Sequence, residues 1–190
     1  MGATTAAALA AALQPLTGLT SLKVSKTLAV PDSVVAFSPA LMGMRRLQVL
    51  DLASNPFSAQ GTAAFAQALL ALAGSLKHLD LSYCQIDAST AASTLAPALA
   101  QVTGLAKLHL VTSNFAPQGA QWLVPVLSNL RHLRKVDLDG CKLGAQGCMA
   151  VAQALKERDA SALSLCCNGV ASVSIDEHEL LNMPGINVFV

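Results

Sequence analysis

A pattern of three apolar residues returns along this chain at nearly constant intervals. The pattern Leu-x-x-Leu-x-Leu begins at Leu47, Leu76 and Leu105, and a fourth copy, with valine as its second apolar residue, begins at Leu133. Successive copies are 29, 29 and 28 residues apart. A fixed period of about 20 to 50 residues is typical of proteins that stack one structural unit many times, and it constrains the fold more than any local signal.

Each copy continues in the same way. A small polar or thiol residue stands three positions after the third apolar residue, and an apolar residue comes two positions after that. These pairs are Asn55 and Phe57, Cys84 and Ile86, Ser113 and Phe115, and Cys141 and Leu143. Weaker copies begin at Leu19, at Ala160 and, after a shortened step, at Met183. The chain is therefore predicted to contain about six repeats and a terminal half-repeat.

Each repeat predicts a strand followed by a helix. Leu50 and Leu52 alternate with polar residues, which places them on one face of a strand. The spacing then changes to four residues, as in Phe57, Gly61 and Phe65, which is typical of one helix face. The glycine near the start of each helix is expected to allow close approach to the preceding strand. One such unit cannot bury its apolar face alone, so neighbouring units must stack, with parallel strands on one side and helices on the other.

The complete unit, L-x-x-L-x-L-x-x-(N/C/S)-x-φ, resembles the leucine-rich repeat family. Its length, and the cysteine or asparagine at the polar position, are similar to the ribonuclease-inhibitor-like subclass. The resemblance covers roughly residues 15 to 190 and implies an α/β solenoid curved like a horseshoe, with parallel strands on the concave face and helices on the convex face. It also implies a noncatalytic protein-protein interaction module, a structural or scaffold subunit of a larger assembly. The alternative is a regulator of an enzyme, such as a GTPase-activating or inhibitor protein, although the strand-to-helix loops hold no recognisable activating constellation.

No linker divides the chain, so one domain is predicted over residues 1–190. Residues 1–18 are predicted to form an N-terminal helical cap, residues 19–170 the repeats, and residues 171–190 a C-terminal cap that ends in an edge strand. Within this last cap, residues 174–182 predict a helix, because Asp176, Glu177 and Glu179 suit its first turn.

Composition bears on the partners. Only 12% of the residues are charged, about half the usual share, which favours burial of surface against other protein subunits. The net charge of +1 predicts no nucleic-acid partner, and the lack of a long apolar run predicts no membrane insertion. Two basic segments, Arg45–Arg46 and 131–135, are interpreted as solvated repeat edges. The five cysteines, without paired spacing, indicate reduced thiols in an intracellular protein. The cytoplasm is the default expectation, with a cilium, the cytoskeleton or an organellar complex as alternatives.

No motif for catalysis or metal binding is complete. His178 and Glu179 resemble the start of a zinc motif, but Asn182 stands where the second histidine is needed. Phosphate-loop, dinucleotide-binding and nucleophile-elbow patterns are missing from the sequence. The chain is therefore predicted not to be an enzyme, and we expect no catalytic residue, no metal, no cofactor and no small-molecule substrate.

The residues that alternate with the inward leucines must project from the concave face. This predicts a partner-binding surface of mixed charge formed by Asp51, His78, Asp80, Lys107, His109, Lys135, Asp137, Asp139 and Tyr83. Strand spacing places Asp51 beside Asp80, with the basic residues in a neighbouring column. Such columns serve either to recognise a protein or only to neutralise one another in solvent, and the sequence leaves both open.

Overall fold

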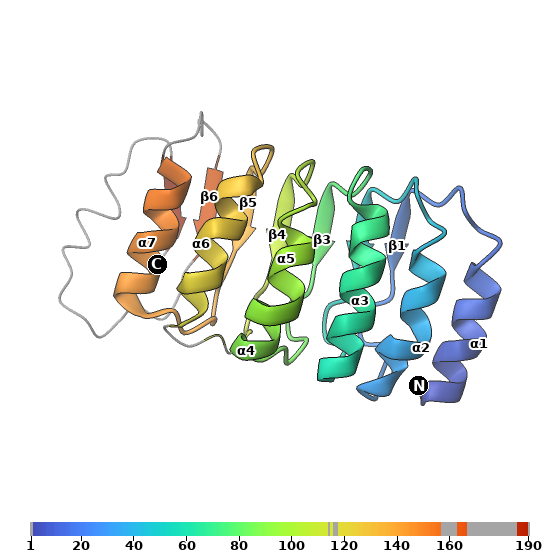
Figure 1. Cartoon of the computed structure of the whole chain (residues 1–190). Helices are drawn as coiled ribbons and strands as arrows, with labels where there is room; N and C mark the ends of the chain where they lie inside the picture. The colour runs from blue at the N-terminus through green and yellow to red at the C-terminus, as the bar shows by residue number, and fades with distance from the viewer. Residues whose placement is uncertain (1, 114, 116–117, 157–162, 167–185, 190) are drawn as a thin grey trace.

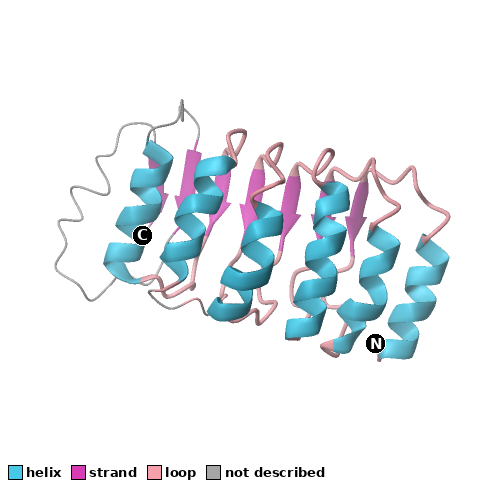
Figure 2. Ribbon diagram, in the orientation of Figure 1, coloured by secondary structure: helices cyan, strands magenta, loops and turns pink. Residues whose placement is uncertain are grey.

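The computed structural model describes residues 2–113, 115, 118–156, 163–166 and 186–189 of the 190-residue chain. One parallel sheet lies behind a layer of helices (Figures 1 and 2). Its strands are β1 (Ser21–Lys23), β2 (Val49–Asp51), β3 (His78–Asp80), β4 (Lys107–His109), β5 (Lys135–Asp137), β6 (Leu163–Cys166) and β7 (Ile186–Phe189). The predicted α/β arrangement of parallel strands and helices on opposite sides is confirmed.

The helices follow the strands in the order that the repeat requires. They are α1 (Ala3–Leu13), α2 (Asp32–Leu41), α3 (Ala59–Leu72), α4 (Ala88–Thr90), the π-helical turn η1 (Ala91–Leu95), α5 (Ala96–Leu99), α6 (Gly119–Asn129) and α7 (Gly144–Lys156). The helix expected over residues 174–182 lies outside the described residues. The division of the chain into cap, repeats and cap stays a prediction.

Strand order in the sheet equals order in the sequence, from β1 to β7. Leu50 is aligned with Leu22 on one side and Leu79 on the other, and Leu108 is aligned with Leu79 and Val136. One period of sequence therefore moves the chain by one strand without any change of register.

The core lies between the strands and the helices. In β1 to β5 the middle residue is buried and its two neighbours are partly or fully exposed. Large buried side chains of α3, such as Phe65, Leu69 and Leu72, meet these strand residues from the helix side. Because every repeat contributes to the same layer, the described residues share one continuous core.

The start of α3 shows how neighbouring repeats fit together. The hydroxyl of Ser58 caps the helix by accepting a hydrogen bond from the N–H of Gly61 at 3.0 Å. A Cβ atom added at Gly61 would lie 3.2 Å from the carbonyl oxygen of Pro31 and 3.2 Å from the Cβ of Val34. The expectation that this glycine allows approach to the preceding strand is therefore wrong. The close neighbours of Gly61 are Val34 in α2 and Pro31, which directly precedes α2.

The turns after β1 to β5 share a left-handed backbone conformation. The φ angle is positive at one position in five successive repeats: Lys26 (55°), Ser54 (58°), Tyr83 (59°), Thr112 (54°) and Gly140 (67°). These residues are one period apart and directly precede the polar position of the repeat. Only one of them is glycine, so this shared turn could not be predicted from glycine alone.

Candidate functional site

The exposed face of the sheet carries two rows of side chains, and we call this surface the strand face. The first row crosses β2 to β5 through Val49, His78, Lys107 and Lys135. The second row crosses the same strands through Asp51, Asp80, His109 and Asp137. Each of these residues flanks the buried middle residue of its strand, so the rows lie on the side of the sheet away from the helices.

The remaining two residues of the predicted surface lie outside the strands. Tyr83 follows β3 in the left-handed turn, where its N–H donates to the carbonyl of Val111, and the residue is 52% exposed. Asp139 follows β5, and its carbonyl accepts a hydrogen bond from the N–H of Thr112 at 2.6 Å. Both therefore belong to the strand-to-helix turns that border the strand face.

The aspartates of the second row have a local structural role. Oδ1 of Asp51 accepts a hydrogen bond from the N–H of Ala53 at 3.0 Å, and Oδ1 of Asp80 accepts one from the N–H of Ser82 at 2.9 Å. Asp137 accepts in the same way from the N–H of Asp139 at 3.3 Å. A short carboxylate that bonds the backbone two residues later favours a turn. The recurrence of aspartate at this position was the signal for this role, which the sequence analysis missed.

An ion pair joins two neighbours of the second row. Nδ1 of His109 lies 3.5 Å from Oδ2 of Asp137, and this is the only ion pair among the described residues. Asp51 and Asp80, at the other end of the row, have no such partner within the described part of the chain. Negative charge therefore collects over β2 and β3, and Lys23 of β1 is aligned beside Asp51 as the next residue of the row.

Positive charge collects in the first row over β4 and β5, where Lys107 and Lys135 are aligned as neighbours. The pKa of the adjacent His78 lies below its usual value because the imidazole is partly desolvated, and the charges of Lys107 and His109 add to this effect. His78 is thus neutral near neutral pH. The strand face therefore presents an acidic pair, Asp51 and Asp80, and a basic pair, Lys107 and Lys135, at diagonally opposite corners.

The thiols at the polar position of the repeat are buried and hold the backbone. Sγ of Cys84 donates to the carbonyl of Leu52 at 3.3 Å, and Sγ of Cys141 donates to the carbonyl of Leu110 at 3.0 Å. Burial raises the pKa of each thiol to about 12, so neither forms a thiolate nucleophile near neutral pH. The described residues also contain no group of three His, Cys, Asp or Glu side chains that could hold a metal ion.

Parallel strands in register, with a buried apolar residue at the centre of each of β1 to β5, are the arrangement that the predicted repeat family requires. The sequence model of the Leucine Rich repeat family matches residues 75–89 and 129–152, which include β3 and β5. The chain is a leucine-rich repeat protein. Domains built from leucine-rich repeats generally mediate protein-protein interaction and are typically noncatalytic. No curated protein matches the sequence. The ribonuclease-inhibitor-like subclass stays a prediction.

The helices of this leucine-rich repeat protein pack along one side of the sheet, and their apolar residues are divided between that core and the outer surface. Within the described ranges, no helix has both the length and the apolar character that are needed to cross a lipid bilayer.

Proposed function

We propose that this leucine-rich repeat protein is a noncatalytic binding module, a structural or scaffold subunit that holds another protein against its strand face. The observation that carries the proposal is the separation of charge on that face. Asp51 and Asp80 form an acidic pair, Lys107 and Lys135 form a basic pair, and neither pair is neutralised by an ion pair within the described residues. A face of this kind selects a partner that carries the opposite charges at the matching distances.

The extended shape of the strand face supports a protein partner over a small molecule. The side chains of the two rows stand on a nearly regular ladder of short strands, which provides an extended surface. The exposed ring of Tyr83 lies beside this surface and can supply an apolar contact at the border. A stable interface of this type buries at least about 1,000 Å² in total. The expected compartment is the cytoplasm, where thiols such as Cys84 and Cys141 stay reduced.

The test is site-specific photocrosslinking in native cells. A photoreactive amino acid replaces Lys107 on the strand face, and a matched variant carries it at Gln67, which is exposed on α3. We expect one or a few proteins to crosslink at position 107 and not at position 67. The double charge reversal Lys107→Glu with Lys135→Glu should weaken the purified complex by about tenfold or more. The same reversal at Lys26 and Lys142, which are exposed in the turns, should leave its affinity within about twofold.

Two results would overturn the proposal. One is equal crosslinking from α3 and from the strand face. The other is a free monomer in native extract, measured by size-exclusion chromatography with light scattering. An enzyme regulator would also bind through this face, so the identity of the crosslinked protein separates the two roles.

A further inference from the structure

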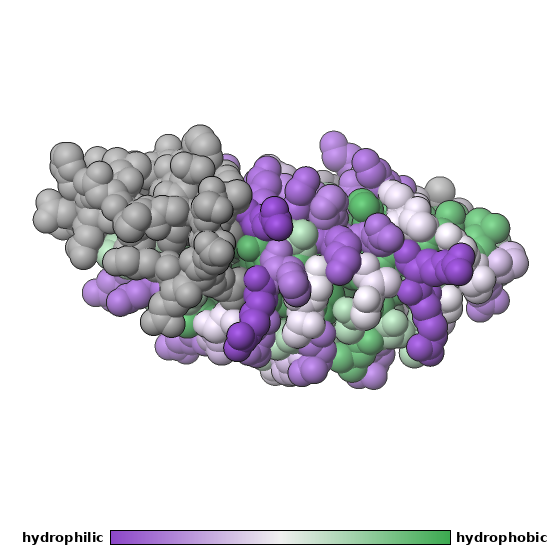
Figure 3. Space-filling model, turned by 90° about the horizontal axis from the view of Figure 1, so that it is seen from above, coloured by the Kyte–Doolittle hydropathy of each residue, from purple (hydrophilic) through white to green (hydrophobic). Residues whose placement is uncertain are grey.

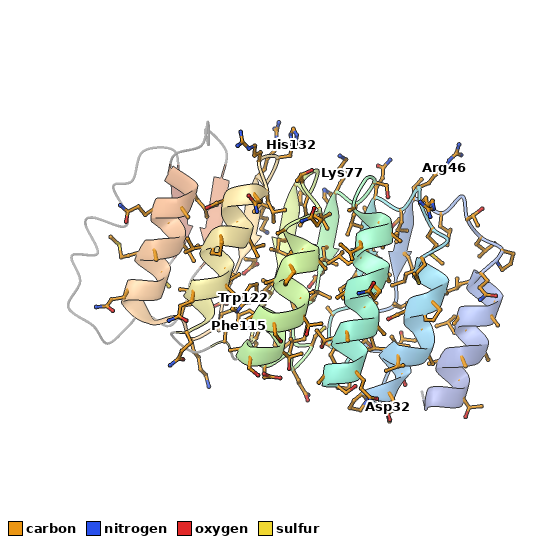
Figure 4. All side chains as sticks on the ribbon, viewed as in Figure 1. Asp32, Arg46, Lys77, Phe115, Trp122 and His132 are labelled. Carbon is orange, nitrogen blue, oxygen red and sulfur yellow. The ribbon has the colours of Figure 1, made fainter. Side chains whose placement is uncertain are left out.

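Over the described residues, the edge of the array where helices end and strands begin carries positive charge and no carboxylate. We call this surface the basic edge. Its described segments, residues 14–20, 42–48, 73–77, 100–106 and 130–134, contain no aspartate or glutamate. The exposed cations there are Arg45, Arg46, Lys77, Arg131 and Arg134, joined by the exposed His132. Figure 4 shows Arg46, Lys77 and His132 along this edge, with Asp32 at the opposite one.

The opposite edge, where strands lead into helices, has a different balance. Its described residues include three carboxylates, Asp32, Asp87 and Asp139, and two cations, Lys26 and Lys142. The near-neutral net charge of +1 for the whole chain therefore hides an asymmetry between its two edges. The two basic segments that were interpreted from the sequence as solvated repeat edges lie on the same edge, and Lys77 lies between them in the order of the repeats.

No described carboxylate compensates the basic edge. The only ion pair among the described residues joins His109 to Asp137 on the strand face. Figure 3 looks down on the basic edge and shows hydrophilic side chains spread along it. Unpaired cations along one edge attract an anionic partner and orient its approach.

A pocket of about 380 Å³ opens in the basic edge. Lys77, His132 and Arg134 contribute its polar groups together with Thr103, while Gly74 and Gly104 contribute only backbone. A Cβ atom added at Gly104 would lie 2.8 Å from Nζ of Lys77. Glycine at this position therefore leaves room for the ammonium group of one repeat to extend over the loop of the next.

The pocket and the row of cations together indicate the chemistry of the ligand. A side-chain carboxylate fits between an ammonium and a guanidinium group, because charge-assisted hydrogen bonds form to both. The loops before β2 and β5 are three strand steps apart, about 14 Å, which an extended peptide of about five residues spans. The described segments of this edge contain no Phe, Tyr or Trp on which bases could stack, which argues against a single-stranded nucleic acid.

We propose that the basic edge binds an extended acidic segment of a partner protein, with one carboxylate in the pocket between Lys77 and Arg134. This surface is separate from the strand face, so it adds a second contact to the function proposed above. Cations placed just beyond helix C-termini also stabilise those helices, and the experiment must distinguish that effect from binding.

The experiment measures binding of a fluorescein-labelled pentaglutamate peptide to the full chain by fluorescence anisotropy. We expect saturable binding that weakens as salt rises from about 50 to 300 mM. The variant Lys77→Glu with Arg134→Glu should lose about tenfold or more in affinity. The matched variant Lys26→Glu with Lys142→Glu has the same net charge, and it should stay within about threefold of the wild type. The strand-face variant Lys107→Glu with Lys135→Glu should behave like this control.

Thermal unfolding of each variant, followed by circular dichroism, shows whether it is folded. If the charge reversal unfolds the protein, Lys77→Gln with Arg134→Gln replaces it, with an expected loss of about threefold to fivefold. Three results overturn the inference: no saturable binding, equal losses at the two edges, or tighter binding of a single-stranded pentanucleotide than of the peptide. None of these affects the strand-face proposal, which rests on its own variant.

Discussion

Oδ1 of Asn55 accepts a hydrogen bond from the backbone N–H of Leu28, one repeat earlier, at 2.7 Å. The same oxygen accepts from the N–H of Thr27 at 2.9 Å, and the amide nitrogen donates to the carbonyls of Val24 and Leu52 at 3.0 and 2.7 Å. Asn55 is fully buried, so one side chain satisfies backbone groups of two adjacent turns where water cannot.

Replacing Asn55 with alanine should destabilise the protein by about 2 to 4 kcal/mol, because buried backbone groups lose their partner and water does not replace it. Chemical denaturation in urea measures the change in the free energy of unfolding. A loss below about 1 kcal/mol would show that the turns do not depend on this side chain.

Two repeats later, Ser113 occupies the same repeat position as Asn55, and its replacement with alanine should not destabilise the protein. Ser113 is buried, and its hydroxyl has no hydrogen-bond partner in the part of the chain that the structure describes. Replacing Ser113 with alanine removes a desolvated polar atom, so we expect a change between about zero and 1 kcal/mol of stabilisation. The denaturation experiment used for Asn55→Ala serves here too, and clear destabilisation by Ser113→Ala would contradict the prediction.

The buried thiols should be unreactive in the folded protein. Cys84, Cys141 and Cys148 are all buried, and burial raises the pKa of Cys84 and of Cys141 to about 12. The variant Cys166→Ser with Cys167→Ser keeps only the three buried thiols. Ellman's reagent at about pH 8 should label almost no thiol of this variant before unfolding and three per chain after it. Rapid labelling of the folded variant would contradict this expectation.

Raising the pH should then weaken the fold through Cys84 and Cys141. Because their folded pKa lies above the unfolded value, the unfolded chain loses protons first, and stability falls as the pH rises above about 9.

His78 should make stability depend on pH in the acidic range. Its folded pKa is lowered, chiefly by desolvation, so the unfolded chain takes up a proton at a higher pH than the folded chain does. Stability is therefore fully present above the ordinary histidine value of about 6.5 and is lost as the pH falls through the folded pKa. NMR titration of the imidazole reports the pKa, and denaturation of the wild type and of His78→Gln at several pH values should show a smaller decline for the variant.

Gly140 should resist substitution. Its φ angle is +67°, and an added Cβ would lie 2.9 Å from Oγ1 of Thr112. Gly140→Ala should therefore cost about 1 to 2 kcal/mol, part of it backbone strain and part of it this contact. In a Thr112→Ala background the cost should shrink, because Oγ1 is gone and only the backbone strain remains. An unchanged cost in that background would show that Thr112 is not the obstacle.

The strands could be predicted because the evidence for them recurs. Leu50, Leu79 and Leu108 share one place in the repeat, and they share one buried row in the sheet. A residue type that returns at one position in every unit must serve the same contact in every unit, and only stacking provides that contact.

The features that could not be predicted depend on local geometry within a repeat. Lys26, Ser54 and Thr112 adopt left-handed conformations although none is glycine, because the tight turn between strand and helix imposes that conformation on whatever residue is there. The π-helical turn η1, where the N–H of Ala96 donates to the carbonyl of Ala91, likewise has no repeated signal. It ends two residues before Pro97, which lacks a backbone donor.

The basic edge lies between these two cases. Its charges were visible in the sequence, but they fall in three different repeats: Lys77 and Arg134 directly follow the first leucine of their repeats, whereas Arg46 directly precedes the first leucine of its own. Only the stacking of the repeats brings them to one edge of the array, so the charge of this surface cannot be recognised from any one of these residues alone.

Because one period of sequence advances the chain by a single strand in unchanged register, this array can grow or shrink only in whole units. Duplication of a segment such as residues 52–80 would insert one more strand and helix while every neighbouring alignment is kept. Loss of a single residue inside a unit would instead misplace Asn55 or its counterparts against the adjoining turn. Natural length variants of this chain should therefore differ by about 28 or 29 residues, and changes of one or two residues should be confined to the loops at the edges.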